Sequence, residues 1–242
     1  MQPTRTYFPD VRQHRKSALV NRMLAGAKQY PGTPTKRKSP LTIVNLLTIA
    51  NHLAPSTLHD DLLFNTLLNT SFTGLLHLGE LTWPHKITLR DYKKLTMRHS
   101  LQWTKTPYSF WLPTHKADTA FEGNHIVIKK ITGAPDPHPI MAQCITSRDT
   151  LFPFHPPLCL RSNGSIPLQS WFIKCLRHYF STQVAGQSLR AGGATAMAEA
   201  GTELQLIKGA GQWSSNAFER YIRKNPVVLH ALILSRSSHY DA

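Results

Sequence analysis

Residues 188–224 read SLRAGGATAMAEAGTELQLIKGAGQWSSNAFERYIRK, and this stretch decides the fold. Its first part, residues 188–200, has a helical pattern that ends at Gly201, a residue type favoured just after a helix C-terminus. Gly192 and Gly193 lie inside this helix, where each glycine costs about 1 kcal/mol relative to alanine. Glycines retained inside a helix predict a close approach of another group.

Three side chains of the stretch can act together on a phosphodiester. The planar guanidinium of Arg190 can donate two parallel hydrogen bonds to a phosphate. The Tyr221 hydroxyl is a candidate nucleophile, and the indole of Trp213 lies eight residues before it in the chain. Each residue alone also has a structural interpretation: Arg190 as an exposed helix arginine, Tyr221 as a core tyrosine and Trp213 as a core tryptophan. The indication of phosphodiester chemistry therefore comes from the three occurring together.

This stretch resembles the C-terminal boxes of the tyrosine recombinase (phage-type integrase) family and is most similar to the versions in fungal Crypton-like mobile elements. The resemblance covers about residues 40–235. It implies an α+β, mostly helical fold, the DNA breaking-rejoining catalytic core, with a small three-stranded antiparallel sheet. It also implies DNA integration and recombination through a 3′-phosphotyrosyl intermediate, with double-stranded DNA as partner and with no metal or cofactor.

The resemblance assigns roles to four side chains. Tyr221, in FERYIRK, matches the nucleophile, and Arg190 matches the second arginine of the HxxR box. Trp213 matches the position where a histidine or tryptophan donates a hydrogen bond. Lys116, in LPTHKAD, matches the hairpin lysine that protonates the leaving 5′-oxygen.

Two positions depart from the family pattern. The box that should hold the first arginine reads TGLLHLGEL over residues 73–81, so His77 stands at the arginine position, although the supporting acid Glu80 is present. Gln187 stands where the HxxR box has histidine. Histidine is mostly neutral at pH 7 and cannot replace a permanent bidentate cation. Glutamine can donate a hydrogen bond but cannot exchange a proton near neutral pH.

These departures leave three functional hypotheses. Loss of a transition-state arginine lowers phosphoryl-transfer rates by on the order of 10³–10⁵, and loss of an acid–base group lowers them by roughly 10²–10⁴. The first hypothesis is therefore a DNA-binding recombinase domain whose activity is weakened or lost. The second is an active enzyme in which His77 and Gln187 suffice. The third is a non-catalytic helix-turn-helix protein built from residues 188–200 and 202–208.

The charge of the chain favours a nucleic-acid partner. The formal net charge is +15 and the isoelectric point is near 10.0, which attracts polyanions. Residues 1–40 hold nine Lys and Arg against one acid. Within them Lys36, Arg37 and Lys38 form a cluster that can contact phosphates, act as a nuclear import signal, or simply be a solvated linker.

The pattern along the chain predicts two parts. Residues 1–40 are interpreted as a basic stub of the N-terminal core-binding domain with its linker, and residues 41–242 as the catalytic domain. Thr42 is a candidate N-cap for the first helix of the catalytic domain, and Thr202 for a short helix after residue 201. Period-two patterns predict three strands, over residues 94–103, 108–113 and 124–131.

Other classes of protein are disfavoured. Cys144, Cys159 and Cys175 are widely spaced and form no CxxC pair, so neither a zinc site nor a disulfide framework is indicated. The chain has no signal-peptide pattern and no apolar run of membrane-spanning length. We expect an intracellular protein, located in the nucleus if the resemblance to fungal elements holds. The family resemblance also implies homo-oligomers on DNA.

Overall fold

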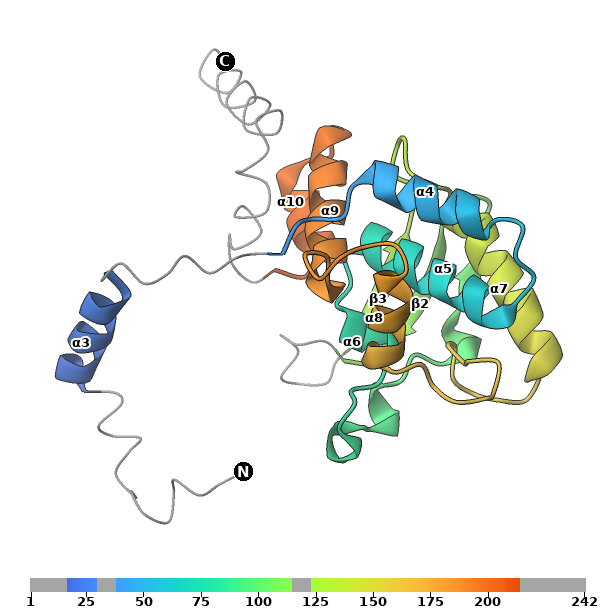
Figure 1. Cartoon of the computed structure of the whole chain (residues 1–242), viewed down its shortest axis with the longest axis horizontal. Helices are drawn as coiled ribbons and strands as arrows, with labels where there is room; N and C mark the ends of the chain where they lie inside the picture. Colours follow the sequence, from blue (N-terminus) through green and yellow to red (C-terminus); the bar gives the residue numbers. More distant parts are fainter. Residues whose placement is uncertain (1–16, 30–37, 115–122, 214–242) are drawn as a thin grey trace. The chain divides into compact units, whose positions relative to one another are not determined.

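A computed structural model describes residues 17–29, 38–114 and 123–213 of the chain. The chain divides into two compact units, Met1–Arg37 and Lys38–Ala242. In the first unit the structure describes one helix, α3 (Ala18–Gln29) (Figure 1).

The described part of the second unit is mostly helical (Figure 1). Its α-helices are α4 (Ile43–Leu53), α5 (His59–Thr73), α6 (Leu78–Leu81), α7 (Pro137–Leu151), α8 (Gln169–Arg177), α9 (Gly186–Glu199) and α10 (Leu204–Ala210). Three 3-10 turns are η1 (Ile87–Leu89), η2 (Tyr92–Lys94) and η3 (Arg98–Ser100). The predicted cap of α4 is confirmed, because the Thr42 hydroxyl accepts a hydrogen bond from the Asn45 N–H at 3.2 Å.

Helix α5 is the centre of the domain, with α4, α7 and α9 packed against it. Its apolar side chains are buried on more than one face, as expected for a helix enclosed by others. Two buried hydroxyls on the same helix have partners: the Thr70 hydroxyl bonds the Tyr108 hydroxyl at 2.8 Å, and the Thr66 hydroxyl donates to the Ile140 carbonyl at 3.3 Å. These bonds tie the central helix to the sheet and to α7.

Gly192 and Gly193 allow α9 to approach its neighbours closely. A Cβ atom on Gly192 would overlap the carbonyl oxygen of Leu41, and a Cβ atom on Gly193 would overlap that of Phe72. The expected close approach is therefore found, and the approaching groups are backbone atoms of the protein itself. This packing determines where the side chains of α9, including Arg190, can lie.

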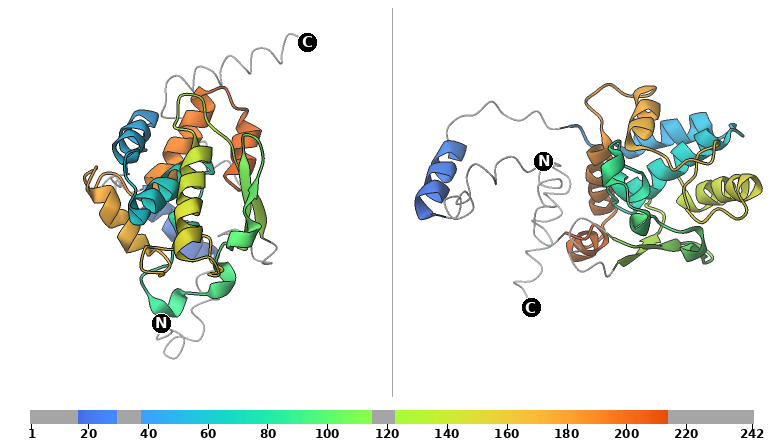
Figure 2. Two further views of the ribbon diagram at one scale, coloured as in Figure 1. Left: turned by 90° about the vertical axis from the view of Figure 1, so that its right-hand side faces the viewer. Right: turned by 90° about the horizontal axis from the view of Figure 1, so that it is seen from below.

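The sheet is antiparallel in the order β1 (Gln102–Trp103), β2 (Tyr108–Leu112) and β3 (Asn124–Ile128). Tyr108 pairs with Ile128 and Leu112 with Asn124. Figure 2 shows the sheet at one edge of the domain, with α4, α5 and α7 on the same side of it. Buried residues alternate along β2, which is the pattern of a strand with one face on a core.

Two sequence predictions about local structure were wrong. The first predicted strand covered residues 94–103, but β1 contains only residues 102–103 and is preceded by η2 and η3. The alternating apolar residues there pack on the chain beyond α7, where the Leu158 N–H donates to the Thr96 carbonyl at 2.9 Å. The second error is the cap of α10, which is Glu203 and not Thr202, with no side-chain capping bond.

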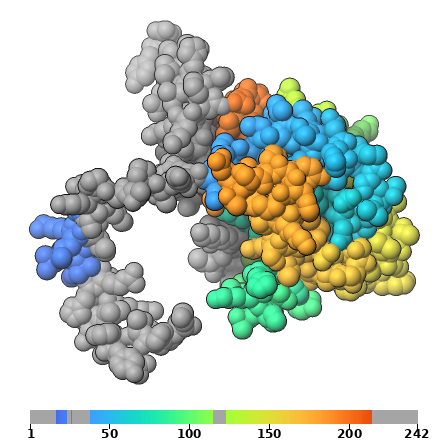
Figure 3. Space-filling view, viewed as in Figure 1, coloured from blue at the N-terminus to red at the C-terminus, as the bar shows by residue number. Residues whose placement is uncertain are grey.

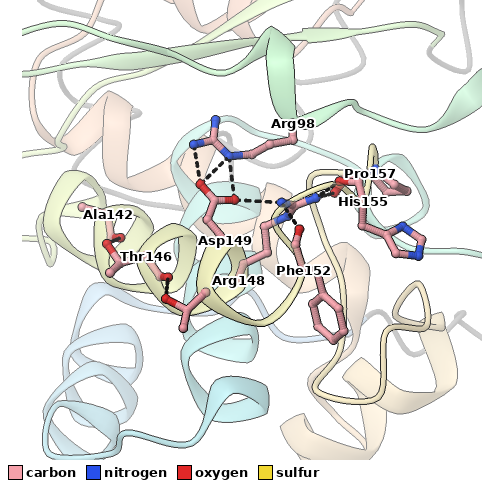
Figure 4. A network of polar contacts seen from close by, with 9 residues as sticks. Arg98, Ala142, Thr146, Arg148, Asp149, Phe152, His155 and Pro157 are labelled. Carbon is pink, nitrogen blue, oxygen red and sulfur yellow. Dashed lines mark hydrogen bonds and ion pairs between the residues drawn. The ribbon is translucent and has the colours of Figure 1, made fainter.

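Arg148 anchors the chain that follows α7 (Figure 4). Its side chain is 1% exposed, and its guanidinium donates to the carbonyls of Phe152 at 3.0 Å, Pro157 at 2.8 Å and also His155. Asp149 accepts from Arg148 at 2.7 Å. A buried arginine requires such partners, because an unpaired buried charge is strongly unfavourable.

Candidate active site

Arg190 is held where the ends of α5 and α10 meet α9. The residue is only 8% exposed. Its Nη1 donates to the Leu75 carbonyl at 3.0 Å, and its Nη2 donates to the Gly211 carbonyl. The guanidinium carbon lies 4.3 Å from the ring centroid of Trp213, a cation–π distance. Arg190 and Trp213, which the sequence predicted to act together, are therefore in direct contact.

The backbone that surrounds Arg190 is strained. Among the described residues, Leu75 and Gln212 are the non-glycine residues with positive φ, each at 53°. Leu75 supplies one carbonyl to Arg190, and Gln212 follows Gly211, which supplies the other. A non-glycine residue in this conformation costs on the order of 1–3 kcal/mol, and such residues cluster at functional sites. The strain around Arg190 marks a site with a geometric requirement.

Glu80 is the acid of the site. His77 is the N-cap of α6, and its backbone N–H donates to Glu80 Oε2 at 2.8 Å. Burial raises the pKa of Glu80 from 4.5 to about 7, although the hydrogen bond from His77 and the positive charge of Arg190 both act to lower it. The carboxyl group therefore titrates near neutral pH beside the guanidinium.

His77 and Gln187 both lie on the surface. His77 is exposed, at the start of α6. Gln187 is exposed in the first turn of α9, three residues before Arg190 and so on the same side of the helix. The structure thus brings Arg190, Trp213 and Glu80 together, with His77 and Gln187 on the surface nearby in the chain.

Four of the predicted site residues, Tyr221, Lys116, Lys36 and Arg37, lie outside the described residues. Their predicted roles stay predictions. Lys38 is described and exposed, and its Nζ donates to the Thr182 carbonyl at 2.7 Å.

The carbonyls of Leu75 and Gly211 and the strained Gln212 are parts of the site that the sequence pattern did not predict. Leu75 gives no signal, because an aliphatic residue is not expected at positive φ. Gly211 gives a weak one, since a glycine just before the candidate tryptophan permits close backbone approach. A Cβ atom on Gly211 would overlap the Trp213 ring.

The described ranges hold no candidate metal site and no membrane-spanning helix. No group of three or more His, Cys, Asp or Glu side chains is placed to hold a metal ion there, and no helix there is long and apolar enough to cross a membrane. The three cysteines are free thiols. Burial raises the pKa of Cys144 to about 11 and that of Cys159 to about 12, so both stay protonated and unreactive at neutral pH.

Comparison with known proteins gives matches among solved structures alone. No protein-family model and no curated protein matches the chain. The XerH site-specific recombinase bound to a palindromic difH substrate, in a post-cleavage complex, matches with a TM-score of 0.54 and 13% identity over 85% of this chain and 54% of that one. The pre-cleavage complex of XerH with difH matches with a TM-score of 0.54 and 13% identity, covering 76% of this chain and 50% of that one.

A lambda integrase (75-356) dimer bound to a COC′ core site matches with a TM-score of 0.49 and 14% identity over 81% of this chain and 62% of that one. The chain spans about half the length of the XerH structures. The predicted fold class, α+β and mostly helical with a three-stranded antiparallel sheet, is confirmed. The resemblance to Crypton-like elements stays a prediction. The described part of the second unit has the fold of a tyrosine recombinase catalytic domain.

Proposed function

We propose that the chain binds double-stranded DNA and acts on it as a tyrosine recombinase domain with weakened cleavage activity. The observation that carries this proposal is the setting of Arg190: a buried guanidinium fixed by two backbone carbonyls, stacked on Trp213 and near Glu80. The recombinases that share this fold were solved with their DNA substrates, before and after cleavage.

The chemistry proposed is a transesterification. Arg190 binds the non-bridging oxygens of the scissile phosphate and stabilises the charge that develops on them. The Tyr221 hydroxyl releases its proton to solvent and its oxygen attacks phosphorus, forming a 3′-phosphotyrosyl bond, while the bond to the 5′-oxygen breaks. Lys116 gives its proton to that oxygen, which leaves as a hydroxyl. The energy of the broken bond is kept in the tyrosyl ester, so rejoining is the same step in reverse.

The weak point of the site is the position of His77. An arginine there would place a second permanent cation near Glu80, and a cation so close would lower the pKa of that carboxyl group. With His77 in place, Arg190 is the cation whose charge lowers the pKa of Glu80, and that pKa remains about 7. Among the residues of these boxes, Arg190 is therefore the one permanent cation that stabilises the transition-state charge, which supports slow cleavage.

The helix-turn-helix alternative is disfavoured by the burial of α9. Most of this helix is enclosed, and its glycines lie against the backbone at Leu41 and Phe72. The second helix of the pair, α10, has only seven residues and exposes Leu206 at 62%. A groove-reading helix presents polar side chains that contact base edges.

A covalent-trapping assay tests the proposal. The full chain is incubated with a nicked DNA duplex, and a protein–DNA adduct that survives denaturant is sought. We expect a faint adduct from the natural sequence, a stronger one from His77→Arg with Gln187→His, and none from Tyr221→Phe. Tyr179→Phe is the matched control, because Tyr179 packs beside Phe64 in the helical core and should leave the adduct unchanged.

Two outcomes oppose the proposal. An adduct of equal strength from Tyr221→Phe removes Tyr221 as nucleophile. If the double variant binds the duplex yet forms no adduct, the chemistry proposed for these residues is wrong. Location in the nucleus, origin in a mobile element and assembly into oligomers on DNA stay predictions.

A further inference from the structure

The segment that follows α6 is unusually basic and exposed. Residues 85–94 read HKITLRDYKK and are called the basic segment here; they carry four Lys or Arg and one acid, Asp91. Ile87, Leu89 and Tyr92 are 75%, 61% and 67% exposed. Figure 3 shows the segment as a green projection at the lower edge of the domain. Exposed apolar side chains grouped with positive charge are typical of a binding surface.

The basic segment is braced internally by Arg90. Its Nε donates to the Pro84 carbonyl and its Nη2 to the His85 carbonyl, both at 3.1 Å. The guanidinium lies 5.5 Å from the ring centroid of Trp83, whose ring also meets Tyr92 edge-on at 5.0 Å. One arginine therefore holds the turn closed, so little conformational entropy remains to be lost when a partner binds.

The base of the segment is fixed to the domain. The backbone N–H of Trp83 donates to the Pro167 carbonyl, and the backbone N–H of Gln169 donates to the Trp83 carbonyl, both at 2.9 Å. Trp83 comes two residues after α6, the helix that carries Glu80. The basic segment thus continues directly from the helix that carries Glu80 (Figure 1).

The charges of the segment divide into internal and outward groups. Asp91 accepts the Lys93 N–H at 3.0 Å and caps η2, so its carboxylate serves the turn. Lys86, Lys93 and Lys94 are exposed. Three outward ammonium groups on a preformed turn suit a partner with repeated negative charges, as in a nucleic-acid backbone.

We propose that the basic segment is a DNA-backbone contact in which Lys86, Lys93 and Lys94 bind phosphates of the duplex held at Arg190. This inference rests on the proposed function. Because α6 leads from the candidate site into the segment, we expect a duplex at Arg190 to extend toward these lysines. Backbone contacts of this kind position a duplex and carry no sequence information.

The test measures duplex binding as a function of salt in a Tyr221→Phe background, where no covalent adduct forms. Each phosphate contact adds about 0.9 to the slope of log affinity against log salt. Lys86→Ala, Lys93→Ala and Lys94→Ala together should lower that slope by about 3 and weaken binding at least tenfold at ~0.1 M salt, equally for unrelated sequences. The three Lys→Arg changes should restore both values.

The matched control removes the same charge elsewhere. Lys105, Lys129 and Lys130 are exposed and lie beyond the Tyr108–Ile128 pair, at the opposite end of the sheet from the Leu112–Asn124 pair. Their triple alanine variant should leave the salt slope within about 1 of the parent value. Thermal unfolding of all variants shows whether the domain remains folded.

The outcomes separate this inference from the proposed function. If the parent binds duplex and both triple variants have the same slope, the basic segment is not the contact, while the proposed function stands. If the Tyr221→Phe parent does not bind duplex and the natural chain forms no adduct, the proposed function fails and this inference fails with it. If the lysine variant loses binding to poly-glutamate but not to duplex, the segment serves an acidic protein instead.

Discussion

Replacing Glu80 with glutamine tests the electrostatics of the candidate site. The pKa of Glu80 is raised by burial from 4.5 to about 7. Between these two pH values the folded protein keeps a proton that the unfolded chain has released. The free energy of unfolding therefore falls as pH rises through this window, and the stability that protonated Glu80 provides is present below about 4.5 and lost above about 7.

The size of the effect follows from the shift. Each pKa unit corresponds to about 1.36 kcal/mol, so the free energy of unfolding falls by about 3 kcal/mol if the whole shift is expressed. Glu80 is partly exposed, and solvent screening reduces the expected value to about 2 kcal/mol. Glutamine keeps an oxygen that can accept the His77 N–H but has no proton to lose.

Urea unfolding of the natural chain and of Glu80→Gln, at a pH of about 4.5 and again at about 8, measures the difference. Comparing the two proteins at each pH cancels the other titrating groups. We expect near-equal stability at the lower pH and a variant more stable by about 2 kcal/mol at the higher pH. A difference that stays below about 0.5 kcal/mol, or that changes in the opposite direction, refutes the reasoning.

Asp60→Asn is the contrasting variant. Burial acts to raise the pKa of Asp60, but hydrogen bonds from Ser162 and Arg161 and the charge of Arg161 outweigh it, so the net shift is downward. Asp60 therefore contributes stability above its ordinary pKa, and this stability is lost as pH falls through the lowered value. Asp60→Asn should be less stable than the natural chain at pH 8, which is opposite in sign to Glu80→Gln.

Two further predictions concern the scaffold. Arg148→Met leaves three carbonyls without their donor and should lower the free energy of unfolding, measured in urea, by about 3–5 kcal/mol. Arg98→Met breaks an ion pair whose arginine side chain is 29% exposed, and it should lower the free energy of unfolding by at most about 1 kcal/mol. Equal losses in the two variants would contradict the assigned role of Arg148. Gly193→Ala forces a methyl group onto the Phe72 carbonyl and should destabilise the protein by about 1–3 kcal/mol. The methyl group of Gly209→Ala meets no atom within 4 Å, so this change should stabilise the protein by up to about 1 kcal/mol. If thermal unfolding shows that both alanine variants change stability in the same direction, the packing assigned to Gly193 is wrong.

Local signals were sufficient for much of the fold. Thr42 before an apolar helical pattern predicted the start of α4, and Gly201 after a helical pattern predicted the end of α9, where its φ is +79°. The strand predicted over 94–103 failed, because its apolar side chains pack on a distant part of the chain and not on a partner strand. Period alone cannot distinguish these two kinds of burial.

The candidate site was predictable only in part. The resemblance predicted that Arg190, Trp213 and Glu80 belong to one site, and in the structure Trp213 and Glu80 both interact with the Arg190 guanidinium. The acceptor at Leu75 is 115 residues away from Arg190 in sequence, and its left-handed backbone is imposed by tertiary packing. No local rule identifies such a residue, since the same leucine in isolation favours negative φ.

The glycine contacts of α9 imply that the fold can outlast the chemistry. Gln187 lies on the surface, where substitutions change stability by about 0.5 kcal/mol or less, so its identity can drift without unfolding the domain. Gly192 has no such freedom, because any side chain there meets the main chain at Leu41. A lineage released from selection for catalysis would therefore lose reactive groups first and keep the backbone that holds them.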